Sequence, residues 1–321
     1  MVDLEVRRLG RTEMEPKALG LGGGYLGLPE LMSEEEATAT IREAIERGIN
    51  FIDTAPPYGD GESERCIGLA LAGGWREKVY LQTKVGSHPR FFHDFSKEAT
   101  LWSLENSFKQ LQTDYVDSVL IHGPRYDMEP LLAPGACLDV LIDWKEQGRI
   151  GHLGIAVRQH EFHQRAIETG AIDIVLSFLD YSLLDQSLAK TTIPLALERD
   201  VGIIMGRVLV GSLLAGPEPQ RVKEKQSLDQ DGNLIPAAIG GPDDPSVVPR
   251  AHQMWQWCQE RGLNIRDLAV QFALNAPVAG NGIVLVGTTN RRELGEVYAS
   301  ATTEVPEAVW QDFEAEFGIR I

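Results

Sequence analysis

The chain has 321 residues, of which 43% are hydrophobic and 24% are charged, a composition typical of a soluble globular protein with enough apolar material for a core. It contains 30 Lys plus Arg and 47 Asp plus Glu residues, which gives a formal net charge of −17. A chain this acidic repels phosphate backbones and anionic lipids, so we expect no nucleic-acid partner and no membrane partner. No apolar run reaches the roughly 18 residues of a membrane span, and the nearest, residues 201–214, carries Arg207.

Cysteines are few, and none lies in a CxxC pair. The three are Cys66, Cys137 and Cys258. An odd and sparse count predicts a reducing compartment without a disulfide framework. The first residues contain no apolar stretch of a signal peptide. We therefore expect a cytoplasmic protein.

Short apolar runs alternate with helical patterns along the chain. Eight of these runs are apolar at consecutive positions, which is typical of parallel strands buried on both faces. They span residues 19–22, 51–53, 79–84, 117–122, 152–156, 173–177, 202–205 and 282–286. This alternation predicts an α/β protein, either a (β/α)8 barrel or a long doubly wound sheet. The length and the lack of a midpoint linker favour the barrel, as a single domain over residues 1–321.

Helices are predicted between these runs. Ser33 and Glu36 form a capping box ahead of an apolar helical face, and Gly48 supplies the left-handed residue that ends this helix. Apolar residues at helical spacing within residues 101–111 and 138–142 predict two further helices.

Three regions lie outside this alternation. Residues 4–18 predict an N-terminal hairpin that turns at residues 10–12. Residues 207–248 form a long loop after the seventh strand and are rich in Gly, Pro and charge. Such a loop at the carboxyl ends of barrel strands is more often a lid than disorder, so we expect it to order over a bound cofactor. A final surface helix is predicted beyond residue 305.

Two patterns resemble ligand motifs without their structural context. Residues 22–27 fit G-x-G-x-x-G, but the next helix starts several residues later, so no Rossmann dinucleotide site is expected. His160 and His163 do not have the spacing of HExxH, and His88 and His93 lie in a predicted loop. We interpret these four residues as solvated histidines, and we expect no metal site.

A stronger signal is the position of four polar side chains. Asp53, Lys84 and His122 end three successive predicted strands, and Tyr58 follows Asp53 in a loop. In a parallel barrel the carboxyl ends of neighbouring strands converge on one mouth, so we expect these four side chains to share a site. Each has an ordinary interpretation alone, such as a turn aspartate or a surface lysine. Four such residues at four matching places favour a functional interpretation.

The residues around these positions resemble the aldo-keto reductase family. Residues 53–68 read Asp-Thr-Ala-Pro-Pro-Tyr-Gly-Asp-Gly-Glu-Ser-Glu-Arg-Cys-Ile-Gly and are similar to the family's D-T-A-x-x-Y-G-x-G-x-S-E-x-x-L/I-G block. Residues 83–86 are similar to its T-K-x-G, and residues 114–122 to its D-Y-x-D…x-H. Residues 148–155 are similar to the family's turn into the fifth strand. The resemblance runs nearly end to end and implies a (β/α)8 barrel that binds a nicotinamide cofactor without a Rossmann fold.

The resemblance also implies catalytic roles for the four polar residues. Tyr58 would donate the proton in carbonyl reduction and accept it in the oxidative direction. A free phenol has a pKa of about 10, so the Lys84 ammonium would be needed to lower the pKa of Tyr58. Asp53 would hold Lys84 in place, and His122 would donate a hydrogen bond to the substrate carbonyl.

A further set of residues is implied to bind the cofactor. It comprises Asp53, Ser177, Gly287, Thr288, Thr289, Asn290, Arg292 and Glu296. Arg291, Arg292 and the free N–H groups of the helix that starts here would favour a 2′-phosphate, whereas Glu293 would oppose one. The choice between NADP and NAD therefore stays open.

Several positions depart from the family pattern. Ala156-Val157 stands where the family commonly has Ser-Asn, and Gly206 or Arg207 stands where an aromatic residue often stacks on the nicotinamide. Residues 176–182 contain no Gln at the usual place and are more similar to the sugar-dehydrogenase branch. The expected substrate is therefore a sugar or a small aldehyde or ketone, and homo-oligomerisation is left open. A non-catalytic cofactor-binding barrel subunit of a larger assembly is the alternative, and a metal-dependent hydrolase lacks ligand clusters.

Overall fold

A computed structural model describes residues 3–124, 127–221, 241 and 244–320. The described residues form eight parallel strands that close into a barrel, each strand paired with its neighbours in sequence and β8 paired with β1. The strands are β1 (Leu19–Gly22), β2 (Phe51–Asp53), β3 (Tyr80–Val85), β4 (Val116–His122), β5 (Ile150–Ala156), β6 (Ile174–Phe178), β7 (Gly202–Gly206) and β8 (Gly282–Gly287). This arrangement confirms the predicted (β/α)8 barrel and all eight predicted strands.

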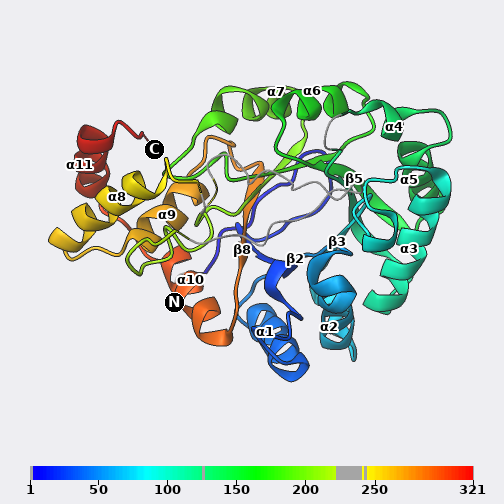
Figure 1. Ribbon diagram of the computed structural model, residues 1–321, viewed down its shortest axis with the longest axis horizontal. Helices are drawn as coiled ribbons and strands as arrows, with labels where there is room; N and C mark the ends of the chain where they lie inside the picture. The colour runs from blue at the N-terminus through cyan, green and yellow to red at the C-terminus, as the bar shows by residue number, and fades with distance from the viewer. Residues whose placement is uncertain (1–2, 125–126, 222–240, 242–243, 321) are drawn as a thin grey trace.

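Helices surround the barrel as an outer ring (Figure 1). The α-helices are α1 (Glu34–Glu46), α2 (Glu62–Leu71), α3 (Lys97–Leu111), α4 (Glu129–Leu132), α5 (Cys137–Glu146), α6 (His160–Glu168), α7 (Thr192–Glu198), α8 (Val248–Glu260), α9 (Ile265–Leu274), α10 (Arg291–Ala301) and α11 (Glu307–Phe317). The 3-10 turns are η1 (Gly23–Tyr25), η2 (Tyr58–Gly61), η3 (Arg76–Lys78), η4 (Pro89–Phe91) and η5 (Ser187–Lys190).

The first predicted helix shows how local sequence sets an element's ends. The Ser33 hydroxyl accepts a hydrogen bond from the Glu36 N–H at 3.2 Å, which caps α1 as expected. Gly48 lies just beyond the helix with φ +93°, a conformation that costs glycine little. The predicted final helix is α11. In contrast, the sequence analysis did not predict α8 and α9, which both lie between β7 and β8.

The N-terminal segment forms the predicted hairpin and closes one end of the barrel. Val6 pairs antiparallel with Lys17. Leu9 is fully buried and packs with Ile174 and other inward-facing strand residues. The turn at Gly10 approaches the start of β7 so closely that a Cβ there would collide with the backbone of Gly202. The hairpin therefore covers the amino ends of the strands, and the carboxyl ends are left for the site.

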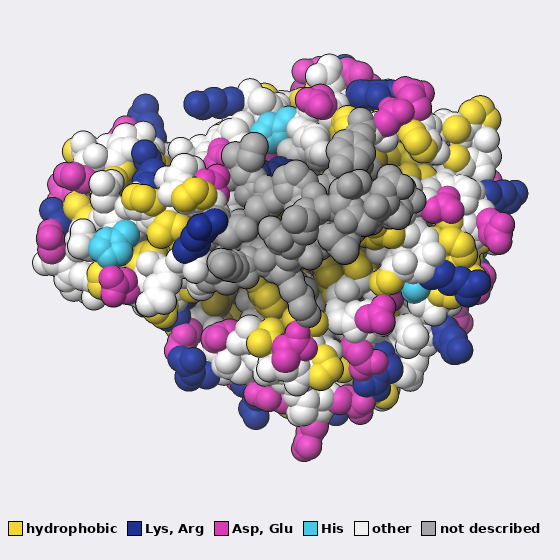
Figure 2. All heavy atoms as spheres, in the orientation of Figure 1, with side chains coloured by type: hydrophobic (Ala, Val, Ile, Leu, Met, Phe, Trp, Pro, Cys, Tyr) yellow, Lys and Arg dark blue, Asp and Glu magenta, His cyan; other side chains and the backbone are white. Residues whose placement is uncertain are grey.

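The loop after β7 is described in part. Residues 207–221, 241 and 244–247 of the predicted lid are described before α8 begins, and the other residues of this loop lie outside the described residues. The expectation that it orders over a cofactor stays a prediction. On the face drawn in Figure 2, Lys and Arg side chains are interspersed with Asp and Glu around the rim. Within the described ranges, no helix is long and apolar enough to cross a membrane.

A buried carboxyl group on α2, that of Glu64, makes the stability of the protein depend on pH. Glu64 is fully buried, and its carboxyl group accepts a hydrogen bond of 2.6 Å from the Thr83 hydroxyl on β3. Burial raises the pKa of Glu64 from its ordinary 4.5 to about 7, although the Thr83 hydrogen bond acts in the opposite direction. The folded protein therefore prefers the neutral acid. Its contribution to stability is complete below pH 4.5 and is lost as the pH rises through about 7.

We expect Glu64→Gln to remove this pH-dependent cost, because the amide keeps the volume and carries no charge. Relative to the unchanged protein, the free energy of unfolding of the variant should rise by roughly 2–3 kcal/mol between about pH 5 and about pH 8. Urea denaturation at the two pH values measures this difference. Glu46→Gln, at an exposed position of α1, serves as the control and should show little pH-dependent change. If the difference in free energy of unfolding between Glu64→Gln and the unchanged protein stays constant with pH, the raised pKa of Glu64 is wrong.

Candidate active site

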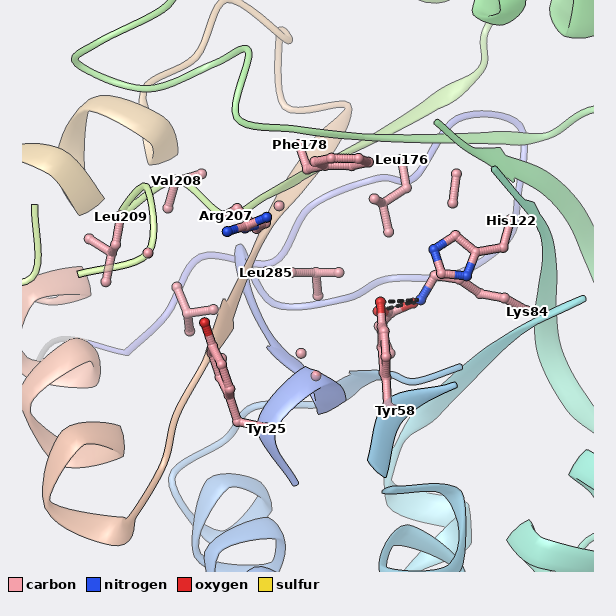
Figure 3. A pocket seen from close by; sticks show the side chains of 18 residues that line it. Tyr25, Tyr58, Lys84, His122, Leu176, Phe178, Arg207, Val208, Leu209 and Leu285 are labelled. Carbon is pink, nitrogen blue, oxygen red and sulfur yellow. Dashed lines mark hydrogen bonds and ion pairs between the residues drawn. The ribbon is translucent and has the colours of Figure 1, made fainter. Parts of the chain in front are cut away.

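A pocket of about 460 Å³ lies at the carboxyl ends of the barrel strands. Every strand contributes its last or next-to-last residue to the lining. These residues are Gly22, Asp53, Lys84, His122, Ala156, Phe178, Gly206 and Gly287. Loop residues complete the wall, among them Tyr25, Tyr58 and Arg207. Figure 3 shows Tyr58 and His122 on one side of the pocket and Tyr25 on the other.

Lys84 and Asp53 form a buried ion pair at the base of the pocket. The Lys84 Nζ donates to both carboxylate oxygens of Asp53, at 2.7 and 2.8 Å, and to the carbonyl oxygen of Thr54 at 2.8 Å. The Lys84 and Asp53 side chains are 1% and 5% exposed. Burial works to lower the pKa of Lys84, but the neighbouring Asp53 carboxylate outweighs it, so the pKa of Lys84 is raised and the amine stays charged. The structure thus brings these two residues together as predicted.

Tyr58 lies beside this ion pair at the start of η2. Its hydroxyl is 3.5 Å from the Lys84 Nζ and points toward it in Figure 3. Burial raises the pKa of the Tyr58 phenol above 10, while the charge of Lys84 acts to lower it. Lys84 therefore lowers the pKa of Tyr58 as expected, but burial has the larger effect and the pKa is raised overall. The phenol keeps its proton at neutral pH, as a proton donor requires.

His122 completes the group from the end of β4. Its ring stands edge-on to the Tyr58 ring, with centroids 6.2 Å apart. Burial, with a contribution from the Lys84 charge, lowers the pKa of His122 to about 3. The imidazole is therefore neutral at physiological pH, with one ring nitrogen that donates and one that accepts. All four predicted catalytic residues line one pocket.

Several polar residues of the site were not predicted from the sequence. Gln82 donates to Asp53 at 2.7 Å and accepts from the Ser118 hydroxyl at 2.9 Å, both bonds lying inside the barrel. Gln82 stands two residues before Lys84 on β3, so strand alternation could have placed both on the same face. Ser87, in the loop after β3, lies 2.7 Å from the His122 Nδ1. No local pattern in the sequence indicated that contact.

Only some of the residues predicted to bind the cofactor line the pocket. Asp53 and Gly287 line the pocket. Ser177 does not, because Leu176 and Phe178 on either side of it point inward and alternation turns Ser177 outward. Its hydroxyl is fully buried and bonds to the Asp180 carboxylate. Ser177 therefore faces the outside of the barrel and not the pocket.

The start of α10 holds most of the remaining predicted cofactor residues. The Thr288 hydroxyl donates to the Asn290 carbonyl at 2.6 Å, and the Asn290 side chain caps the helix by accepting from the Glu293 N–H at 2.9 Å. The Glu293 carboxylate accepts from the N–H and hydroxyl of Thr289, at 2.9 and 2.7 Å. Arg292 pairs with Glu296 at 2.6 Å. The Glu293 carboxylate therefore already accepts a backbone N–H hydrogen bond just before α10.

The pocket has the size of a small-molecule site and a largely apolar wall. Its volume lies within the range of about 300–1,000 Å³ that is usual for ligand sites. Five of the lining residues are glycines, and a Cβ built at one of them, Gly24, would meet no atom within 4 Å. Apolar groups from Leu176, Phe178 and Leu285 face the same space.

The interpretation of the four histidines as solvated is wrong for His163 and, in part, for His160. His163 is fully buried, where it bonds to the Thr192 hydroxyl at 2.8 Å and to the Val157 carbonyl at 3.1 Å. Burial lowers the pKa of His163 to about 4. His160 is partly buried and lies 3.0 Å from the Asp180 carboxylate. Among the described residues, no group of three or more His, Cys, Asp or Glu could hold a metal ion.

Comparison with known proteins shows what the chain is similar to. Residues 18–315 match the model of the aldo/keto reductase family. The L-galactose dehydrogenase of Arabidopsis thaliana is 28% identical over 310 residues, covering 94% of this chain and 89% of that protein. The D-threo-aldose 1-dehydrogenase of a Pseudomonas species is 27% identical over 320 residues, covering 92% of each.

A solved structure supports the fold. The holo form of an aldo-keto reductase from Bacillus halodurans superposes with a TM-score of 0.73 over 98% of this chain and 96% of that one, at 21% identity. With the family model matched over most of its length, the chain belongs to the aldo/keto reductase family of NAD(P)-dependent oxidoreductases.

Proposed function

We propose that the protein transfers a hydride between a nicotinamide cofactor and the carbonyl or alcohol of a sugar or a small aldehyde or ketone. The observation that carries this proposal is the convergence of Tyr58, Lys84, Asp53 and His122 in one pocket. The names of the two dehydrogenase relatives support a sugar substrate. The three cysteines are all free and buried, which supports a cytoplasmic location.

We assign each of the four residues a different role in the reaction. The Tyr58 hydroxyl gives its proton to the carbonyl oxygen as negative charge develops there, and in the oxidative direction the phenolate takes it back. Lys84 stabilises that phenolate by its charge, and Asp53 keeps Lys84 charged and oriented. His122 donates a hydrogen bond that orients the carbonyl. The nicotinamide, when bound, supplies or accepts the hydride.

A substrate screen tests this proposal. Purified protein is mixed with a panel of aldoses, their lactols, simple aldehydes and ketones, with NAD, NADP or their reduced forms. Absorbance of the reduced nicotinamide reports turnover. We expect turnover with at least one sugar or carbonyl compound. Cofactor binding without turnover across the panel would favour a non-catalytic cofactor-binding subunit instead.

We further propose that the protein prefers NAD to NADP. The Glu293 carboxylate already accepts from the Thr289 N–H, and a 2′-phosphate near it would meet a like charge. Arg291 pairs with Glu43 and Arg292 with Glu296, but Glu43 also pairs with Arg47 and Glu296 also pairs with Arg266. The proposed preference for NAD therefore rests on the charge of Glu293 and not on neutralised arginines.

Glu293→Gln should narrow this preference, because it removes the negative charge and keeps the side chain's shape. We expect kcat/KM for NADP to rise about three- to tenfold relative to NAD, a change of order 1 kcal/mol. Kinetics with both cofactors at saturating substrate measure the ratio. The control is Glu304→Gln, an exposed carboxylate beyond the other end of α10. A ratio that stays the same in Glu293→Gln would contradict the role of this carboxylate.

A further inference from the structure

The loop after β3 places a serine hydroxyl against the catalytic histidine. Gly86 has φ +87° and turns the chain directly after the strand, and a Cβ at this position would collide with the Phe95 ring. The next residue, Ser87, is buried at 5% exposure. Its Oγ lies 2.7 Å from the His122 Nδ1, a normal length for a hydrogen bond.

The direction of this hydrogen bond follows from the partners available. A neutral imidazole carries one hydrogen, on either Nδ1 or Nε2. Within the described part of the chain, the Ser87 hydroxyl has no hydrogen-bond partner besides His122. If Nδ1 carried the hydrogen, the buried serine O–H would be left without an acceptor, which costs free energy. With Ser87 as donor, both groups are satisfied and the imidazole hydrogen resides on Nε2.

We propose that Ser87 is a positioning residue that holds His122 in the tautomer with its hydrogen on Nε2, so that this nitrogen donates to the substrate carbonyl. The proposal rests on the proposed function for what the Nε2–H does, but the tautomer itself is a property of the protein alone. His122 lines the pocket beside Tyr58. Among the described residues its ring has one hydrogen-bond partner, Ser87 at Nδ1, so the Nε2 is available to a substrate. Burial keeps the ring neutral, so a wrong tautomer would present an acceptor to the carbonyl oxygen and repel it.

The first experiment reads the tautomer without any substrate. Protein labelled with ¹⁵N-histidine is studied by NMR, and the His122 signals are identified by their absence in His122→Gln. The nitrogen that carries the hydrogen resonates at the lower ¹⁵N frequency, so the two tautomers are distinct. We expect an Nε2–H signal for His122 near neutral pH. A hydrogen on Nδ1 would overturn the proposal.

The second experiment compares three variants. Ser87→Ala removes the donor, and we expect kcat/KM to fall about tenfold while the cofactor Kd stays within a factor of two. Ser87→Thr keeps a hydroxyl and should restore most of the loss together with the Nε2–H signal. Ser103→Ala is the matched control, because Ser103 is also buried and its hydroxyl has no partner among the described residues.

The outcomes separate this proposal from the proposed function. If Ser87→Ala keeps the wild-type tautomer and kcat/KM, Ser87 does not position His122, whatever the reaction is. If the wild-type protein shows no turnover while the expected tautomer and its loss in Ser87→Ala are observed, the positioning role holds and the proposed reaction fails. Should Ser87→Ala fold poorly, a hydrogen on the His122 Nδ1 in the unchanged protein or in Ser87→Thr would still overturn the proposal.

Discussion

Tyr58→Phe should lower kcat by about 100- to 10,000-fold, the range typical of losing a positioned general acid. The phenyl ring keeps the volume and the packing at the start of η2 but has no proton to transfer. Cofactor affinity, measured by quenching of protein fluorescence, should change less than twofold. The exposed Tyr115 offers a matched control, because Tyr115→Phe makes the same chemical change far from the pocket.

The pH dependence of the same residue gives a second readout. Reduction needs the protonated phenol, so its rate is maintained below the pKa of Tyr58 and falls above it. Because burial raises that pKa above 10, we expect no decline assignable to Tyr58 across neutral pH. Near wild-type kcat in Tyr58→Phe would show that another group donates the proton, and the proposed mechanism would then be wrong.

Lys84→Met should damage both stability and turnover, because it leaves the Asp53 carboxylate buried without its cation. Removing one partner of a buried ion pair costs about 3–5 kcal/mol in free energy of unfolding. The hydrogen bond from Gln82 to Asp53 would remain but cannot replace the charge. Without the nearby ammonium, the pKa of Tyr58 should rise further and the phenolate should form less readily. Urea denaturation and steady-state kinetics measure the two effects.

A double variant distinguishes charge balance from catalysis. Asp53→Asn combined with Lys84→Met removes both charges, so it should regain much of the lost stability without regaining turnover. If the double variant unfolds more easily than Lys84→Met alone, the unpaired carboxylate is not the source of the instability. If it recovers turnover, Lys84 has no role in the reaction.

The convergence of Asp53, Lys84 and His122, which we propose to be catalytic, was predictable because it depends on strand order and strand ends. In a parallel barrel, an inward-facing residue at the carboxyl end of a strand reaches the same mouth. Asp53, Lys84 and His122 meet that condition in three successive strands, so recognising the strands was enough to bring them together. The family resemblance then supplied the roles that strand position alone does not specify.

The contacts around that group were less predictable, since they depend on distant parts of the chain. The contact between Ser87 and His122 joins residues 35 apart, and it follows a turn at Gly86 that lies against the Phe95 ring. Ser177 was expected at the cofactor, but the phase of alternation in β6 turned it outward. That phase follows from how β6 packs between its neighbours, which a short apolar run does not reveal.

By itself, then, the sequence determined the eight strands, and the length and the family resemblance favoured the barrel over a doubly wound sheet. The strand ends then determined the convergence of the proposed catalytic side chains, although α8 and α9 were not predicted. The tertiary structure alone decided the burial of His163, the closing of the barrel's amino end by Leu9, and the occupation of the α10 start by Glu293. Each of these depends on which side chains packing brings within hydrogen-bonding or van der Waals distance, and the free energy of such contacts is not encoded in any short stretch of residues.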